Sequence, residues 1–422
     1  MTDDWFRAAR FGLFVHFGLY SLAARHEWVR GYEEMSDAAY RRYFEHFDPD
    51  RFDAAAIARR ARETGMRYVV LTTKHHDGFC LWDSAETGYT SAKACGRDLV
   101  AEFVTAARAE GLRVGLYHSL LDWNHPDFTV DGVHPLRHAG DLAELNAGRD
   151  MARYRAYLHA QVRELLTGYG PIDLMFYDFT YPYDRGGLPG KGPEAWASEE
   201  LLALTRELQP GISVNNRLGV PGDYVTPEQY QPERPVVVDG VEVRWEACQT
   251  LNGSWGYHRD NLDYKEPDLL VRMLVQSVAA GGNMLLNVGP TGRGDLDPRT
   301  TAILGAVAGW MEAHERAVHG AGAAPFDPPP NTLYTLRGDR LYLHVLAWPL
   351  RHLHLPGLAG RVRYAQLLDD GSEVPFSVLD TAPPAYANLA LPPQPPGTLT
   401  LSLPIRRPEV LLPVVELFLG EP

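Results

Sequence analysis

The stretch Ile172-Asp173-Leu174-Met175-Phe176-Tyr177-Asp178 is an apolar run that ends in a carboxylate, just before an aromatic loop that contains Pro182. A strand that is buried on both faces of a parallel sheet has this near-continuous apolar character. In barrels of parallel strands, polar side chains at the carboxyl ends of the strands lie where substrates bind. We therefore interpret Asp178 as a candidate catalytic carboxylate, with a loop-capping aspartate as the alternative.

Similar runs recur along the first three quarters of the chain and alternate with longer amphipathic segments, a pattern that predicts βα units around a parallel sheet. We expect strands at 11–17, 68–73, 113–118, 173–178, 213–217, 241–246 and 283–288, and helices at 53–64, 98–110, 151–166, 198–208, 268–280 and 300–317. These strands favour an α/β fold, a (β/α)8-like TIM barrel whose eighth strand the sequence does not place and whose irregularity we expect near residue 318. An open doubly wound sheet is the alternative, but no G-x-G-x-x-G follows an early strand.

The residue composition changes beyond Ala324. A linker there contains Pro325, Pro328, Pro329 and Pro330 and therefore cannot continue a helix. Short alternating runs follow, separated by Pro and Gly turns, and predict a small antiparallel β-sandwich with strands at 341–347, 362–368, 398–403 and 414–419. We therefore expect a barrel domain at 1–324 and a C-terminal β-sandwich domain at 325–422. The second domain gathers no acids or histidines, so we expect it to pack against the barrel, with carbohydrate binding as the alternative.

Composition and charge narrow the class of partner. The 422 residues carry a formal net charge of −14, which argues against nucleic acid and anionic membranes as partners and suits neutral substrates. The scattered Cys80, Cys95 and Cys248 indicate neither a disulfide framework nor a zinc site. The acidic start Met1-Thr2-Asp3-Asp4 gives no sign of a signal peptide, and no apolar run is long enough for a membrane span, which predicts a cytoplasmic protein. The oligomeric state is left open.

Polar or aromatic groups follow one expected strand after another, at or just past its carboxyl end: His16, His75, His76, Tyr117, Asp178, Arg217 and Glu246. In a barrel these strand ends converge on one mouth. Each residue alone also fits a structural role, such as a satisfied core histidine or a salt-bridge partner. Metal catalysis is a competing chemistry, but the first strand lacks a His-x-His pair, and the adjacent His75 and His76 point to opposite sides of an extended chain. We expect no metal and no cofactor.

Tryptophans and tyrosines gather in or near the expected loops at the strand ends: Trp28, Trp82, Trp123, Trp245, Trp255, Tyr177, Tyr181 and Tyr183. Flat aromatic faces suit the apolar faces of sugar rings, while His, Arg and carboxylate groups suit the hydroxyls. Burial in the core is the alternative for any single aromatic residue. Together these residues predict a carbohydrate site.

The segment Trp5-Phe6-Arg7-Ala8-Ala9-Arg10-Phe11-Gly12-Leu13-Phe14-Val15-His16-Phe17-Gly18-Leu19-Tyr20-Ser21 resembles the opening signature of glycoside hydrolase family 29, the α-L-fucosidases. Further matches follow in the family's order: Glu27-Trp28, Lys74-His75-His76-Asp77-Gly78-Phe79, Gly115-Leu116-Tyr117-His118-Ser119, Asn215-Asn216-Arg217, Ser254-Trp255-Gly256-Tyr257 and Gly282-Asn283-Met284-Leu285-Leu286-Asn287-Val288-Gly289-Pro290. They run across most of residues 5 to 290, and the tail is similar to the family's C-terminal β-domain.

The resemblance implies an exo-acting, retaining α-L-fucosidase that needs no metal and releases terminal α-L-fucose from a fucosylated oligosaccharide or glycoconjugate. Retention requires a nucleophile and an acid/base carboxyl about 5 to 5.5 Å apart. Asp178 matches the family nucleophile and is expected to be ionised, whereas burial or a nearby negative charge is expected to keep its partner protonated.

The acid/base is expected in the loop after the fifth strand. Glu228, in Thr226-Pro227-Glu228-Gln229, is similar to where the family places this group. Glu246 is the alternative acid/base. If Glu246 does not have this role, we expect it to support the residues of the site or to contact the sugar. We favour Glu228, because a loop residue reaches the leaving-group side of the sugar while a strand residue lies deeper.

The same matching implies a fucose pocket that contains His16, Glu27, Trp28, His75, His76, Tyr117, Arg217 and Trp255. Several hydroxyl-directed contacts in one pocket would make monosaccharide recognition strict, because an unmatched buried polar group is costly. The chain departs from the family pattern at Phe17 and Phe176, where the family often has Trp. Both positions keep an aromatic face and lose an indole N–H, which leaves the fine substrate preference open.

Two other functions remain as alternatives. One is a different retaining exo-glycosidase of the same fold, acting on a related deoxy or galacto-configured sugar. The other is a carbohydrate-binding relative that has lost catalysis, which two candidate carboxylates argue against. The glycosidic linkage that is cleaved is not predicted, because leaving-group recognition depends on variable loops such as 125–149 and 182–192.

Overall fold

The strand quoted first shows how the sequence builds the barrel. It forms β4 (Leu174–Asp178), all of whose residues are buried. Leu174 and Phe176 belong to the hydrophobic cluster inside the barrel, while Met175 and Tyr177 belong to the larger cluster between strands and helices. Because successive side chains of a strand point to opposite faces, Asp178 continues the inward set. An apolar run without visible alternation therefore still has two distinct faces.

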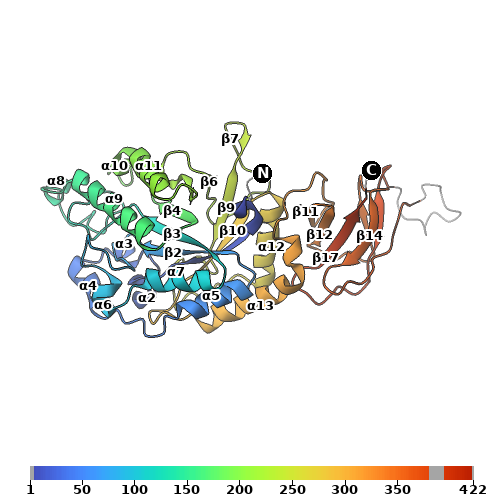
Figure 1. Ribbon diagram of the computed structural model, residues 1–422, viewed down its shortest axis with the longest axis horizontal. Helices are drawn as coiled ribbons and strands as arrows, with labels where there is room; N and C mark the ends of the chain where they lie inside the picture. Colours follow the sequence, from blue (N-terminus) through green and yellow to red (C-terminus); the bar gives the residue numbers. More distant parts are fainter. Residues whose placement is uncertain (1–3, 380–393, 421–422) are drawn as a thin grey trace.

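The computed structural model describes residues 4–379 and 394–420 and shows the barrel beside a smaller β-rich part (Figure 1). Eight strands form one sheet in the order β5-β4-β3-β2-β1-β10-β9-β6, with parallel pairing throughout. A parallel bridge between Asn215 and Tyr224 joins the two edges, so the sheet closes into a barrel. The strands are β1 (Phe11–Val15), β2 (Tyr68–Lys74), β3 (Arg113–Ser119), β4, β5 (Ser213–Val214), β6 (Tyr224–Val225), β9 (Arg244–Gln249) and β10 (Asn283–Val288).

The predicted (β/α)8-like barrel is confirmed, with two corrections. The strand that the sequence left unplaced is β6, and the strand expected at 241–246 divides into an outlying hairpin, β7 (Val237–Val238) with β8 (Val241–Glu242), followed by β9. The irregularity lies between β5 and β9 rather than near residue 318. Residues 215–243, all of which the structure describes, contain the 3-10 turn η1 (Asn216–Leu218) and no α-helix.

Helices surround the barrel and begin largely where polar caps predict. At six of them an aspartate side chain accepts a capping hydrogen bond from a backbone N–H of the first turn; these caps are Asp4, Asp53, Asp98, Asp141, Asp150 and Asp297. The helices are α1 (Trp5–Ala9), α2 (Tyr20–Ala23), α3 (Val29–Tyr32), α4 (Asp37–Glu45), α5 (Ala54–Glu63), α6 (Ser91–Cys95), α7 (Leu99–Ala109), α8 (Leu142–Leu145), α9 (Met151–Gly168), α10 (Pro193–Trp196), α11 (Ser198–Leu208), α12 (Pro267–Ala279), α13 (Pro298–His314) and the 3-10 turn η2 (Glu315–Ala317). Among the described residues, no helix has the length and apolar composition that crossing a bilayer requires.

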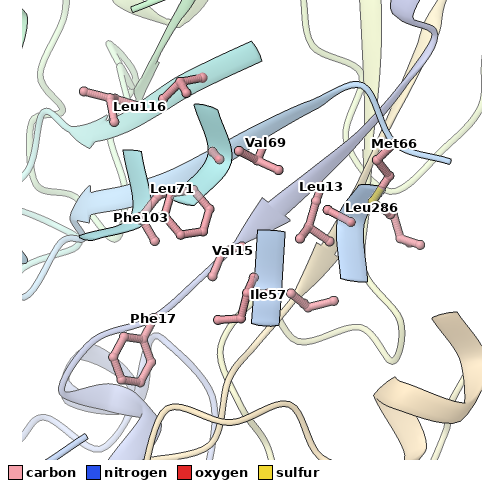
Figure 2. Close-up of a cluster of buried hydrophobic side chains, with 14 of the residues drawn as sticks. Leu13, Val15, Phe17, Ile57, Met66, Val69, Leu71, Phe103, Leu116 and Leu286 are labelled. Atoms are coloured by element: carbon pink, nitrogen blue, oxygen red, sulfur yellow. The ribbon is translucent and has the colours of Figure 1, made fainter. Parts of the chain in front are cut away.

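Two hydrophobic layers fix the strands. The outer layer packs side chains of β1, β2, β3 and β10 against α5 and α7, including Leu13, Leu71 and Phe103 (Figure 2). The inner layer fills the barrel and admits the Tyr68 ring because Gly12 lies beside it, where a Cβ would come within 2.4 Å of that ring. Below this layer, Asn283 donates to the carbonyl oxygen of Phe6 in α1 (2.8 Å), so α1 covers the amino-terminal end of the barrel.

The C-terminal part consists of two antiparallel sheets with their own buried cluster, which confirms the expected β-sandwich. Its strands are β11 (Thr332–Arg337), β12 (Arg340–Val345), β17 (Val414–Leu419) and β14 (Val362–Leu367) in one sheet, and β13 (His352–Leu355), β16 (Leu399–Ser402) and β15 (Phe376–Ser377) in the other. The indole of Trp310 in α13 donates to the carbonyl oxygen of Leu412 (2.8 Å) and ties this part to the barrel. The division at residue 324 stays a prediction, and residues 1–3, 380–393 and 421–422 of the two expected domains lie outside the described residues.

Candidate active site

A pocket with about 440 Å³ of free space, including its open mouth, lies at the carboxyl-terminal ends of the barrel strands. Nine of the ten predicted site residues line it, together with four that were not predicted as site residues. The lining residues are Phe14, His16, Trp28, His75, His76, Tyr117, Phe176, Asp178, Phe179, Arg217, Glu228, Cys248 and Trp255. The structure therefore brings together residues that are more than 200 positions apart in the sequence.

Asp178 ends β4 and lies in the pocket wall with a fixed orientation. Its Oδ1 accepts a hydrogen bond from Nη1 of Arg217 (2.8 Å), and its Oδ2 accepts one from the hydroxyl of Tyr117 (2.9 Å). Burial raises the pKa of the Asp178 carboxyl, but the charge of Arg217 and these hydrogen bonds outweigh burial and hold the pKa below its usual value. Asp178 is therefore an oriented carboxylate that stays ionised at neutral pH.

Arg217 joins the two candidate catalytic groups. The residue lies in η1, directly after β5, and its Nη2 forms an ion pair with Oε2 of Glu228 (2.8 Å) while Nη1 binds Asp178. Thr226 fixes the guanidinium by accepting from Nε (2.7 Å), and the Phe176 ring lies below it at 5.1 Å. The Glu228 side chain is 42% exposed, so it lies at the open side of the pocket and not in the buried setting expected for the acid/base.

The three pocket histidines follow β1 and β2 at the carboxyl ends of these strands. Burial lowers the pKa of His16 to about 3 and that of His76 to about 4, so both rings are neutral. Nδ1 of His16 lies 2.6 Å from Oδ1 of Asn287, and Nδ1 of His76 lies 2.7 Å from Oγ of Ser119, whose own hydrogen goes to the Leu121 carbonyl. Each Nδ1 is therefore the protonated nitrogen and each Nε2 is an acceptor, and Nε2 of His76 lies 4.0 Å from Oδ2 of Asp178.

His75 offers a further polar atom. Its Nδ1 is buried and has no hydrogen-bond partner among the described residues, which is uncommon for a buried polar atom. Because β2 ends at Lys74, the extended geometry that separates adjacent side chains no longer applies, and His75 and His76 both face the pocket. Their ring centroids are 4.0 Å apart.

Aromatic rings form the rest of the wall. Trp28 packs edge-on against His76 (5.0 Å between centroids) and beside Phe179 (5.1 Å). On the other side, Trp255 lies 5.2 Å from His16 and 6.0 Å from Phe14. These rings give the pocket flat apolar faces next to the histidine acceptors.

Glu27 is the one predicted site residue that does not line the pocket. Its carboxylate is buried and accepts hydrogen bonds from the backbone N–H groups of Trp255 (3.0 Å) and Gly256 (2.9 Å). Burial raises the pKa of Glu27 to about 7, and the backbone hydrogen bonds act against that rise. The contact places Glu27 behind the loop that presents Trp255, where it supports the pocket wall.

Glu246 lies in the floor of the barrel rather than in the pocket. It is paired in register with Asn283, the first residue of β10, and Tyr68, the first residue of β2, donates to its Oε2. Its Oε1 has no partner among the described residues, and burial raises its pKa to about 8. The next inward residue of β9 toward the mouth is Cys248, which does line the pocket.

Four lining residues were not among the predicted site residues. Phe14 and Phe176 precede His16 and Asp178 by two positions, so the two-residue period of their strands places them on the same inward face. The same period links Cys248 to Glu246. Phe179 has a positive φ of 80°, and no pattern in the sequence indicates that conformation.

Several expected contributors lie elsewhere. Phe17 packs against Phe47 and Phe52, with ring centroids 5.7 and 5.2 Å away, so the departure from the family pattern at this position does not alter the pocket. Trp82 and Trp245 are buried outside the pocket. In the described parts of the chain, no group of three or more His, Cys, Asp or Glu side chains is arranged to hold a metal ion, and metal independence stays a prediction.

Comparisons with known proteins agree on one family. The family model described as alpha-L-fucosidase matches residues 1–316. The tissue alpha-L-fucosidase of Bos taurus is 31% identical over 377 residues, which cover 82% of this chain and 75% of the relative. The tissue alpha-L-fucosidase of Homo sapiens is 30% identical over 379 residues, which cover 82% and 76%.

Solved structures give the same answer. Alpha-L-fucosidase isoenzyme 1 from Paenibacillus thiaminolyticus is similar to this chain with a TM-score of 0.89 and 42% identity, over 99% of this chain and 98% of that chain. An α-L-fucosidase of family 29 from Bacteroides thetaiotaomicron, trapped as a covalent intermediate with 2-fluoro-fucosyl fluoride, has a TM-score of 0.82 and 28% identity over 99% and 95%. The chain therefore belongs to glycoside hydrolase family 29, the α-L-fucosidase family.

Proposed function

We propose that this protein is an exo-acting, retaining α-L-fucosidase that releases terminal α-L-fucose from fucosylated glycans through a covalent fucosyl-enzyme intermediate. The observation that carries the proposal is Asp178, an ionised carboxylate whose two oxygens are oriented by Arg217 and Tyr117 inside a pocket. A nucleophile in a retaining glycosidase needs this combination of charge and orientation, because one oxygen must bond the anomeric carbon. The trapped intermediate of the Bacteroides relative supports the same mechanism.

The neutral histidines fit the hydroxyls of a deoxyhexose. His16 and His76 line the pocket from two strand ends, and their Nε2 atoms are left as acceptors because each Nδ1 is engaged within the protein. A buried atom that lacks its partner costs about 1 to 3 kcal/mol, so a sugar that does not offer a hydroxyl at each position is rejected. The flat faces of Trp28 and Trp255 complete the fit by covering apolar faces of the ring.

We propose Glu228 as the acid/base and Glu246 as a neutral acid of the barrel floor. Glu228 lines the pocket and shares Arg217 with Asp178, whereas Glu246 lies one inward position below the lining residue Cys248. A proton donor must reach the glycosidic oxygen directly or through one water, and Glu228 is the one of the two that borders the space where that oxygen would lie. To act, Glu228 has to turn from the guanidinium toward the bound sugar.

Trapping the intermediate tests the function and the nucleophile together. We expect 2-deoxy-2-fluoro-fucosyl fluoride to inactivate the enzyme and to leave its label on the peptide that contains Asp178. The matched variant Asp178→Asn should take up no label under the same conditions. A label on another residue would refute the nucleophile, and an enzyme that turns over other nitrophenyl glycosides but not the fucoside would refute the sugar.

A pair of variants tests the acid/base. Glu228→Ala is expected to lose most activity on fucosides with poor leaving groups, to keep activity on the dinitrophenyl fucoside, and to be rescued by azide with formation of fucosyl azide. Glu246→Gln, the control, should show neither the leaving-group dependence nor the rescue. The opposite assignment would follow if azide rescued only a variant at 246.

The alternatives and the finer assignments have their own tests. A panel of nitrophenyl glycosides separates a fucosidase from another exo-glycosidase of this fold, and sugar binding without turnover would indicate an inactive relative. We propose that the protein has no nucleic acid or membrane partner, because its formal net charge is −14. A cytoplasmic location stays a prediction, which fractionation of the native cell would check.

A further inference from the structure

An aromatic residue continues the pocket wall onto the surface. The ring of Tyr32 stacks on that of Trp28, with centroids 5.7 Å apart and planes 28° apart. Trp28 is the N-cap of α3 and Tyr32 is the last residue of this helix, one turn later, where its N–H donates to the carbonyl oxygen of Trp28 (2.9 Å). Trp28 lines the pocket, whereas Tyr32 is 64% exposed. The wall therefore extends from the sugar pocket to solvent without a break.

The surroundings of Tyr32 hold its ring in place although nothing among the described residues covers it. The ring of His26 lies 5.2 Å from it on a plane tilted by 36°. Glu33, which caps α3, forms a two-point ion pair with Arg25 (2.7 and 2.9 Å) and fixes the backbone beside Tyr32. A ring that is ordered before binding loses little conformational freedom when a ligand covers it.

We infer that Tyr32, whose ring is stacked on Trp28, forms a platform for the pyranose ring to which the fucose is attached. The inference rests on the proposed function, which places fucose in the pocket. The next sugar must then lie at the mouth, where an exposed tyrosine face presents what the apolar face of a pyranose needs. Tyr32 is not among the residues that line the pocket.

Two other exposed tyrosines are rivals for this role. Tyr230 is 61% exposed and follows Glu228 by two residues, and Tyr183 is 73% exposed in the loop after β4. Within the described residues, neither ring contacts another aromatic ring, so neither is joined to the pocket wall as Tyr32 is. The contact with Trp28 is what favours Tyr32.

The test compares two substrates with the same fucose and different leaving groups. α-L-Fucosyl fluoride has no second ring, whereas a disaccharide of fucose and a hexopyranose has one. Because kcat/KM for both reports the step that expels the leaving group, the ratio of disaccharide to fluoride kcat/KM isolates recognition of the second ring. We expect Tyr32→Ala to lower this ratio about five- to tenfold, which corresponds to the typical worth of one aromatic stack.

The controls give each outcome a meaning. Tyr32→Phe keeps the ring and should keep the ratio within about twofold, as should Tyr230→Ala and Tyr183→Ala. A ratio that is unchanged in Tyr32→Ala, or that falls only in one of the two rival variants, overturns the platform while the fucosidase proposal stands. Hydrolysis of neither substrate by the unmodified enzyme would overturn the proposed function, and the platform with it.

Discussion

Glu246 is the residue for which the structure gives the sharpest quantitative expectation. Its side chain is fully buried in the barrel floor, Tyr68 satisfies one carboxyl oxygen, and the other has no partner among the described residues. Burial raises its pKa from 4.5 to about 8, because an ionised carboxylate there would lack solvation. The folded protein therefore keeps a proton on Glu246 that the unfolded chain releases near pH 4.5.

The sign and size of the effect on stability follow from proton linkage. Below pH 4.5 the carboxyl is protonated in both states, so its titration does not affect folding. From pH 4.5 to about 8 only the unfolded chain is ionised, and the free energy of unfolding falls by about 1.4 kcal/mol per pH unit. By pH 7 the loss is about 3 kcal/mol. Glu246→Gln keeps the shape of the neutral acid and does not titrate, so its stability relative to the unmodified protein should rise by that amount.

Urea unfolding between pH 5 and 8 measures this difference. The expected result is a gap between the Glu246→Gln and unmodified proteins that is small at pH 5 and widens steadily toward pH 8. The exposed Glu207 provides the matched control, because Glu207→Gln makes the same substitution at a carboxyl that lies in solvent. The reasoning is refuted if the gap for Glu246→Gln is constant across the range.

Four further variants address the site and the joint between the two parts of the chain. Asp178→Asn should lower kcat on an aryl fucoside by about 10⁴-fold or more, as seen when a nucleophile is removed, with the pocket still binding fucose in calorimetry. Arg217→Met removes the charge that holds the pKa of Asp178 down, and burial then raises this pKa. The acidic limb of the pH profile of kcat/KM should therefore move to higher pH. Tyr117→Phe removes a single hydrogen bond to Asp178 and should move this limb less. Trp310→Phe leaves the Leu412 carbonyl without its donor and should lower the unfolding free energy by about 1 to 3 kcal/mol in a denaturant titration.

The sequence was sufficient to predict the barrel because each long strand is a separate apolar run with its own flanking loops. The helix expected at 198–208 and the strand expected at 283–288 have the predicted bounds. β6 was missed because its two residues carry no periodic signal, and pairing with β9 and the bridge to Asn215 define it. The run 241–246 looked like one strand although it contains the end of the hairpin, β8, and the start of β9. The turn of the hairpin lies before the run, at Gly240, which has a positive φ.

The site was predictable where it depends on position along a strand. His16, Tyr117 and Asp178 each lie at the carboxyl end of a strand, and a barrel brings such ends together whatever lies between them. The chemistry between side chains was not predictable in the same way. Nothing in the residues around Glu27 indicates that its carboxylate binds two backbone N–H groups from a loop 228 positions later, because that contact exists only after the barrel has closed.

Arg217 lies between the carboxylates of Asp178 and Glu228. This position relates to the two roles that we propose for Glu228, which acts first as an acid and then as a base. In the resting site its guanidinium divides its charge between Asp178 and Glu228. When Asp178 becomes esterified by the sugar, as we propose, it loses its negative charge, and Glu228 becomes the remaining anionic partner of the guanidinium. The guanidinium charge then faces Glu228 alone, the residue that we propose to activate water in the second step. In the mechanism that we propose, formation of the intermediate thus changes the surroundings of the base that removes it, because one arginine contacts both carboxylates.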